Sequence, residues 1–153
     1  MRTIAEAVVP EGTPPPLPGF VVSSFSPLVA DAAERCLAGQ PPAGDRTAVV
    51  VVSASGDARM AEHVAHLVDG GARIGPLLFF QAVPNSVAGH VAARWGLRGP
   101  VVCLCPTGDP RAEGLAQARL LIDDGDADEV LVVLVEQADA GDSAHALLIG
   151  DSR

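Results

Sequence analysis

The amino-acid sequence predicts an α/β fold, a layered mixed sheet with helices packed on it. Two runs, Thr47–Val52 and 130–135, are apolar without polar alternation, which is typical of strands buried on both faces. Segments with helical spacing separate these runs, and this βαβ-type alternation indicates a layered α/β domain. With 153 residues, 48% of them apolar, the chain is long enough for one domain with a sizeable core.

The first 25 residues form a proline-rich segment ahead of a single domain over 26–153. The apolar run 3–9 within this segment is either an edge strand or disordered, and the edge strand is favoured because its aliphatic side chains need cover. Residues 12–19 are dense in proline, which predicts a stiff and extended stretch.

Two helices are expected in the first half of the chain. Ser26 and Pro27 predict the start of the first, with serine as the N-cap and proline in the first turn, and Gly39 ends it. Asp57 begins the second, and Gly70 closes it.

The central stretch 79–107 predicts a loop, a short amphipathic helix, a Gly-Pro turn and a buried strand. Pro84 opens the helix, the Asn85 side chain can cap its free amides, and the apolar spacing continues to Trp95. The strand, 101–105, delivers the chain to a strand-to-helix corner, where we expect the chemistry.

The last third of the chain predicts one more helix and two strands. Asp109 and Pro110 both suit a helix N-terminus, and that helix ends at Gly125. The second fully apolar run follows, then a polar turn over 137–142 and a final strand over 144–149.

The charge of the chain disfavours several classes of partner. Acidic residues number 19 against 10 basic ones, for a net charge of −9, and no basic run is present. We therefore expect no nucleic-acid partner. The longest apolar runs fall far short of the roughly 20 residues that cross a bilayer, so we expect no membrane partner and a cytoplasmic location.

The three cysteines have no metal-type spacing, and their odd number fits a reducing compartment. Cys36 belongs to a helical pattern and is expected in the core. Cys103 and Cys105 point to one face of a strand, and inert packing is the favoured interpretation because burial raises a thiol pKa. His63 and His66 have no third ligand nearby, so we expect no metal and no cofactor.

Four motifs follow one another in a fixed order along the chain. They are Phe79-Phe80, then VPNSVAGHV at 83–91, then RWGLRGP at 94–100, then GDAD at 125–128 ahead of an apolar strand. Together they resemble the N-terminal half of the β-ketoacyl synthases, the thiolase-fold condensing enzymes of fatty acid and polyketide synthesis. The resemblance covers roughly residues 26–136 and implies a thiolase-like half-fold.

The resemblance also assigns the nucleophile position. In the family, a strand after Gly-Pro leads to an elbow whose cysteine accepts the acyl group, and counting from either Gly99 or Gly125 puts that position on Gly108. Glycine has no side chain to acylate. The sequence also stops at Arg153, before the second half, which carries the decarboxylating histidines and a lysine. We therefore expect a truncated ketosynthase-like protein that lacks the elbow cysteine, which favours a non-enzymatic role and leaves an enzyme of another kind as the alternative.

The resemblance further implies a dimer. The strand before the elbow meets its twofold mate in the family, so a homodimer or a heterodimer with an active ketosynthase is expected. Chain-length factors, ketosynthase relatives that lost the cysteine and keep both halves, are the precedent. An acyl carrier protein is another implied partner, and the acidic net charge weighs against its direct docking. The expected interface residues are Val101, Val102, Cys103, Leu104 and Cys105.

The first functional hypothesis is therefore a non-catalytic partner or scaffold in type II polyketide or fatty acid biosynthesis. The alternative is a small acyl-thioester enzyme, dependent on an acyl carrier protein, with Cys105 as nucleophile or with Thr107 and Asp109 as an acid/base pair at the corner.

A third hypothesis is a binder of a small acyl or carboxylate ligand. Its pocket would be lined by Phe79 and Phe80, and the backbone amides of Gly108 and Asp109 at the start of the helix would bind a carbonyl oxygen or an anion.

Overall fold

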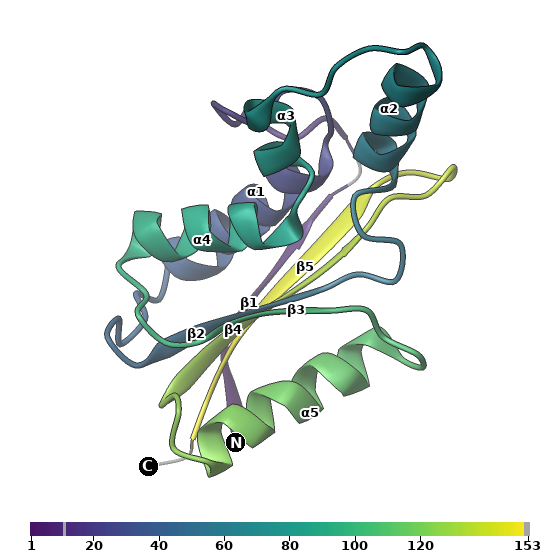
Figure 1. The fold of residues 1–153 in the computed structure, drawn as a ribbon. Helices are drawn as coiled ribbons and strands as arrows, with labels where there is room; N and C mark the ends of the chain where they lie inside the picture. Colours follow the sequence, from purple (N-terminus) through teal and green to yellow (C-terminus); the bar gives the residue numbers. More distant parts are fainter. Residues whose placement is uncertain (11, 152–153) are drawn as a thin grey trace.

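The computed structural model of this protein describes residues 1–10 and 12–151. Its strands and helices follow the order that the sequence predicts, with one additional short helix, α3 (Figure 1). The elements are β1 Arg2–Val9, α1 Phe25–Ala38, β2 Thr47–Val52, α2 Ala58–Asp69, α3 Pro76–Gln81, α4 Pro84–Trp95, β3 Val101–Leu104, α5 Pro110–Asp123, β4 Glu129–Glu136 and β5 Ser143–Gly150.

The strands form one five-stranded sheet in the order β1-β5-β4-β2-β3. β2 is parallel to both β3 and β4, whereas β5 is antiparallel to β4 and to β1. The sheet is therefore mixed, as predicted, and the predicted edge strand at the N-terminus is confirmed as β1. β3 forms the opposite edge.

Helices cover both faces of this sheet, α1 and α4 on one side and α5 on the other (Figure 1). The β2 side chains show why its sequence lacks polar alternation. Val49 and Val51 pack into the core beneath α1 and α4, while Val50 and Val52 pack into the core beneath α5. All six β2 residues are buried, as predicted for a strand enclosed on two faces.

Two glycines allow close approaches that position the corner between β3 and α5. A Cβ atom at Gly114, on α5, would lie 3.0 Å from the side chains of both Val52 and Val132, so the helix backbone packs directly on the sheet. A Cβ at Gly99 would lie 2.7 Å from the backbone of Thr47, so only glycine lets the chain enter β3 this close to β2.

The predicted N-caps of two helices were wrong. α1 begins at Phe25 with Ser24 as its N-cap, and Ser26 is instead buried in the first turn. α4 begins at Pro84 with Val83 as its N-cap and no side-chain cap. In α4 the proline already occupies the first turn, where its fixed φ suits the helix, so Asn85 lies inside the helix.

The loop predicted at Phe79 was also wrong, because residues 76–81 form the short helix α3. Gly75 is its N-cap and Pro76 occupies its first turn, which is a common way to start a helix. The sequence PLLFFQ has no amphipathic pattern to indicate a helix, and most of the helix is exposed, with Gln81 as its buried residue.

The prediction that β3 is a buried strand was wrong as well. Its residues alternate between exposed and partly buried, because β3 lies at the edge of the sheet and only β2 pairs with it within the described chain. The strand ends at Leu104, so Cys105 follows it.

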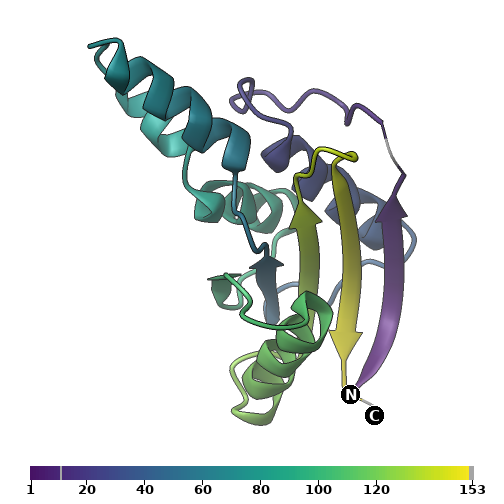
Figure 2. The same ribbon diagram turned by 90° about the vertical axis from the view of Figure 1, so that its right-hand side faces the viewer.

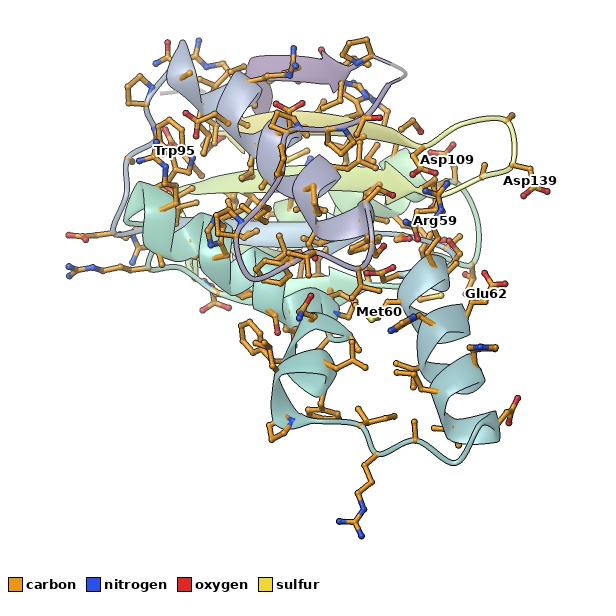
Figure 3. The ribbon with its side chains drawn as sticks, turned by 90° about the horizontal axis from the view of Figure 1, so that it is seen from above. Arg59, Met60, Glu62, Trp95, Asp109 and Asp139 are labelled. Atoms are coloured by element: carbon orange, nitrogen blue, oxygen red, sulfur yellow. The ribbon has the colours of Figure 1, made fainter. Side chains whose placement is uncertain are left out.

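Helices α2 and α3 stand away from the body of the molecule (Figure 2). α2 buries only Met60, at the end that meets the sheet (Figure 3). Large apolar side chains of α3 are exposed, including Leu77 at 66% and Phe79 at 70%. In the described part of the chain, no helix is long and apolar enough to cross a membrane.

Candidate functional site at the corner between β3 and α5

Asp109 is the N-cap of α5. Its Oδ1 accepts a hydrogen bond from the backbone N–H of Ala112 at 2.6 Å, and Pro110 follows in the first turn. The Asp-Pro pair thus starts the helix as the sequence predicts. The Asp109 carboxylate satisfies an amide of its own helix.

Glu113 lies in the first turn of α5, and its side chain turns back to the loop that precedes the helix. Its carboxylate accepts hydrogen bonds from the backbone N–H of Thr107 at 3.0 and 3.2 Å and from the backbone N–H of Gly108 at 2.5 Å. The Thr107 hydroxyl lies 3.4 Å from the same carboxylate. The Gly108 amide, offered by the sequence as a ligand donor, therefore holds a carboxylate of the chain itself.

Sequence analysis did not single out Glu113. The signal available was its position in the first turn of a helix that begins with Asp-Pro, where a carboxylate is electrostatically favoured. That position does not say whether the side chain turns back to the preceding loop.

Cys103 and Cys105 line one cavity of about 310 Å³ near the end of β3. The Cys105 Sγ lies 3.5 Å from the backbone carbonyl oxygen of Ala54. Although Cys103 is exposed at the edge of the sheet, desolvation by the surrounding protein raises the pKa of its thiol to about 11, so it carries little thiolate at neutral pH. The other lining residues are Phe25, Val51, Ser53, Ala54, Ser55, Gly56, Pro84 and Leu104.

The two α3 phenylalanines lie elsewhere. Phe80 lines an open groove of about 550 Å³ beside α4, where its ring packs 5.8 Å from that of Phe20. This groove shares no lining residue with the cavity at Cys105, and neither includes Gly108 or Asp109. The structure thus does not bring the phenylalanines and the corner amides into one of these pockets.

A histidine that sequence analysis left without a role packs near the start of α5. His145, on β5, lies between Glu6 of β1 and Arg111 of α5, with its Nε2 2.5 Å from Glu6 Oε1 and its Nδ1 3.2 Å from Arg111 Nη1. Arginine only donates, so Nδ1 accepts and the ring proton sits on Nε2, facing Glu6. The contact with His145 lowers the pKa of the Glu6 carboxyl, and the contact with Arg111 lowers it further.

Both ring nitrogens of His145 therefore lie close to side chains of the same chain, although only Nδ1 has a partner with hydrogen-bond geometry. Among residues 1–10 and 12–151, no group of three or more histidines, cysteines or carboxylates could hold a metal ion. The histidines predicted on α2, His63 and His66, belong to no such group.

Solved structures of ketosynthases and chain length factors share this fold. A ketosynthase in complex with its chain length factor from Xenorhabdus doucetiae matches with a TM-score of 0.70 and 25% identity, over 86% of this chain and 58% of that chain. The ishigamide ketosynthase/chain length factor matches with a TM-score of 0.76 and 19% identity, over 89% and 46%. The predicted thiolase-like fold is confirmed.

A β-ketoacyl-[acyl carrier protein] synthase III from Thermus thermophilus is similar with a lower TM-score of 0.56 and 24% identity, over 84% of this chain and 37% of that one. The chain thus spans about half the length of the structures it matches. No curated protein sequence matches it.

The fold and the corner between β3 and α5 define a ketosynthase-like half-fold. The family model described as "Beta-ketoacyl synthase, N-terminal domain" matches residues 20–141. The chain belongs to this family, as its motifs predict.

Proposed function

We propose that this chain is a non-catalytic ketosynthase-like partner or scaffold in type II polyketide or fatty acid biosynthesis, acting as a homodimer or with an active ketosynthase. The observation that carries this proposal is the arrangement of Gly108 and Glu113 at the corner between β3 and α5. The position that the family resemblance assigns to the nucleophile is Gly108, and the amide of that residue already binds Glu113.

The missing side chain at Gly108 and the occupied Gly108 amide each weigh against acyl transfer at the corner. Without a side chain, Gly108 forms no thioester. Acyl transfer also develops negative charge on the carbonyl oxygen, which needs free donors, and the Glu113 carboxylate takes the donors of Thr107 and Gly108 while adding a negative charge of its own.

A role as a partner is supported by the similar structures and by exposed apolar surface. One similar structure is described as a ketosynthase with its chain length factor, and another as a ketosynthase with a type II acyl carrier protein. In this chain, Val101 on the β3 edge is 41% exposed, and large apolar side chains of α3 are exposed as well. Exposed apolar surface is a feature of protein–protein contacts where it is contiguous.

The test is the molar mass in solution, measured by light scattering after size exclusion, for the chain alone and mixed with a ketosynthase encoded beside it. We expect a dimer of the chain, a complex with the ketosynthase, or both. A monomer that forms no complex would contradict the proposal.

A second candidate function rests on the Cys105 thiol, which is exposed and lines the cavity near the end of β3. In this function the chain transfers an acyl group from a carrier-protein thioester to Cys105. The Cys105 thiol donates a hydrogen bond to the Ala54 carbonyl oxygen, which is not a base. The test is to incubate the chain with an acyl carrier protein thioester and to look for an acyl adduct by mass spectrometry. An adduct that is lost in Cys105→Ser and kept in Cys103→Ser would support this function, and no adduct would contradict it.

A further inference from the structure

Cys103 and Cys105 place two thiols on the wall of one cavity. Sequence analysis favours inert packing for this pair, yet both residues are exposed and both line the cavity of about 310 Å³ near the end of β3. Cys36 is buried in α1 and belongs to a different part of the molecule. The two thiols of the cavity are therefore open to the same ion or reagent from solvent.

The backbone sets the spacing of these two thiols. β3 pairs with β2 in a regular parallel register, and the ladder reaches its last residue, because the Ser53 N–H donates to the Leu104 carbonyl at 3.0 Å. Alternate residues of an extended chain point to one face and lie roughly 6.5 Å apart. A disulfide needs Cβ atoms about 3.5–4.5 Å apart, so Cys103 and Cys105 do not join directly unless the backbone changes.

An ion held between the two sulfur atoms fits this spacing better than a disulfide does. A metal–thiolate bond is about 2.3 Å long, so two such bonds separate the sulfur atoms by up to about 4.6 Å. The S–S bond of a disulfide is only about 2.05 Å long. Rotation of the two cysteine side chains then has to close a difference of roughly 2 Å, without a change in the strand.

The rest of the cavity offers no other strong ligand. In the part of the chain that the structure describes, no group of three or more histidines, cysteines or carboxylates could hold an ion. The Ser53 hydroxyl accepts a hydrogen bond from the Gly56 N–H at 3.0 Å, and the Ser55 hydroxyl donates to the Glu136 carboxylate at 3.3 Å. A structural zinc ion takes four ligands, whereas soft thiolates also select Cu(I), which two sulfur atoms satisfy.

The charge of the cavity also favours a bound cation over a free pair of thiolates. None of the residues that line it is charged, and desolvation raises the pKa of the Cys103 thiol to about 11. Two thiolates alone would carry two unbalanced charges there, and a cation between them offsets this cost. The Ala54 carbonyl oxygen, 3.5 Å from Cys105 Sγ, adds a negative dipole end beside the ion.

We propose that Cys103 and Cys105 of a single chain bind one soft monovalent metal ion of the Cu(I) class. In the binding step two S–H bonds break, two metal–sulfur bonds form and two protons pass to solvent, so the charge of the ion and its ligands becomes −1 and no atom is oxidised or reduced. The site is independent of the proposed partner role. While the ion is bound, it prevents acyl transfer to Cys105.

The test is a competition for Cu(I) between the chain and a chromogenic Cu(I) chelator, in anaerobic buffer with ascorbate as the reductant. We expect the wild type to take one ion per chain. Cys103→Ser and Cys105→Ser should each weaken binding by about 100-fold or more, because the second thiolate acts at high effective concentration once the first is bound. Cys36→Ala is the matched control and should leave the affinity and the stoichiometry unchanged, with circular dichroism to confirm that each variant is folded.

An equimolar mixture of Cys103→Ser and Cys105→Ser distinguishes one chain from two as the source of the ligands. We expect the mixture to bind as weakly as each variant alone, because neither chain then holds both thiols. X-ray absorption of the wild-type complex should show two sulfur ligands and no nitrogen or oxygen ligand.

Three results would each overturn the proposal. The first is a wild-type chain that takes no ion from the chelator, and the second is full binding by either serine variant or by their mixture. The third is an absorption spectrum that requires nitrogen or oxygen ligands. The molar mass of the chain, alone and with the ketosynthase, tests the partner role separately, so failure of the metal site leaves that role standing.

Discussion

A single carboxylate decides the chemistry of the corner between β3 and α5. Gly108 has no positive φ, and the neighbour within 4 Å of a Cβ built there is Glu113 Oε1 at 3.2 Å, the end of a flexible side chain that would have to shift by a few tenths of an ångström. The backbone thus does not exclude a side chain at the position that the family resemblance assigns to the nucleophile. What the fold adds is the Glu113 carboxylate, which occupies the amides that a reacting acyl group would need.

Replacing Gly108 with cysteine should therefore give a poorly reactive thiol. A carboxylate close to a thiol raises its pKa and lowers its thiolate fraction. In a background with Cys103→Ser and Cys105→Ser, we expect Gly108→Cys to react with iodoacetamide about ten-fold faster once Glu113→Gln is added, which corresponds to about one pKa unit.

The matched control for that series is Asp123→Asn, which removes a carboxylate at the far end of α5, where it pairs with Arg119. It should leave the alkylation rate of the new thiol unchanged. Equal alkylation rates with and without Glu113→Gln, or an effect of Asp123→Asn as large as that of Glu113→Gln, would contradict the role given to Glu113.

The helices show how one residue type acts differently in two elements. Gly114 lies where α5 packs directly on β2 and β4, whereas a Cβ added at Gly89 on α4 would meet nothing within 4 Å. Both positions have ordinary helical backbone. The close packing of α5 thus depends on a missing side chain, and the α4 glycine contributes no such packing.

The paired substitutions Gly114→Ala and Gly89→Ala should consequently change stability in opposite directions. The first forces a methyl group against Val52 and Val132 and should lower the free energy of unfolding by about 1–3 kcal/mol. The second should raise it by about 0.5–1 kcal/mol, because alanine is the better helix former. Urea denaturation followed by circular dichroism measures both, and a stabilised Gly114→Ala would refute the packing account.

The projecting helix α2 is held mainly at its first turn. Asp57 caps it, accepting hydrogen bonds from the Met60 N–H at 3.0 Å and the Ser23 hydroxyl at 2.5 Å. Arg59 reaches Asp142 in the turn between β4 and β5 at 2.9 Å. Figure 3 shows Arg59 and Met60 at the end of α2 that meets the sheet.

The Asp57 cap should make stability depend on pH. Burial raises the pKa of its carboxyl above the ordinary value, so the folded state binds this proton more tightly than the unfolded state. The resulting stabilisation is complete below the unfolded pKa of about 3.9 and is lost as the pH rises through the folded pKa. We expect the free energy of unfolding of the wild type, minus that of Asp57→Asn, to increase as the pH falls from neutral toward about 4.

Urea titrations at several pH values measure this difference. Asp69→Asn is the control, because Asp69 is exposed at the other end of the same helix. A difference that stays flat for Asp57→Asn, or that Asp69→Asn reproduces, would show that the cap does not titrate in this way.

At the scale of the whole molecule, the chain is asymmetric. One edge of the sheet is charged and irregular, the other is uncharged and regular, and an arm of α2 and α3 that exposes apolar side chains of α3 projects from the body (Figure 2). We call the charged and irregular β1 edge the closed side of the molecule, and the uncharged and regular β3 edge the open side. Association, rather than further folding of the described chain, is the simplest way to cover the open side.

A lysine on each edge should separate the two sides. Cys103→Lys should weaken the proposed dimer by about 100-fold or more, because the lysine of each copy would be desolvated where the β3 edge meets its partner. Thr3→Lys on the β1 edge should leave the dimer unchanged. Light scattering over a dilution series measures both, with circular dichroism to confirm folding, and equal effects of the two lysines would contradict the assignment of the open side.

The sequence by itself determined the family and every described element except the short helix α3. The apolar runs of β2 and β4, the Asp-Pro start of α5 and the ordered motifs around Gly99 are local patterns, and each predicts its structure because backbone geometry and burial act over a few residues. The N-caps at Ser26 and Asn85 were misplaced, since Ser24 is an equally good local start for α1 and Pro84 starts α4 without a side-chain cap.

Only the tertiary structure decided which strand lies at the edge, which side chains meet and which donors are occupied. An apolar strand has the same sequence pattern whether it pairs with one neighbouring strand or with two. For this reason β3, which lies at the edge of the sheet, was expected to be buried. The return of Glu113 to the Gly108 amide and the contact between Glu6 and His145, which lie near opposite ends of the chain, arise only when the chain closes on itself. Such contacts depend on strand order and register, which local sequence patterns do not encode.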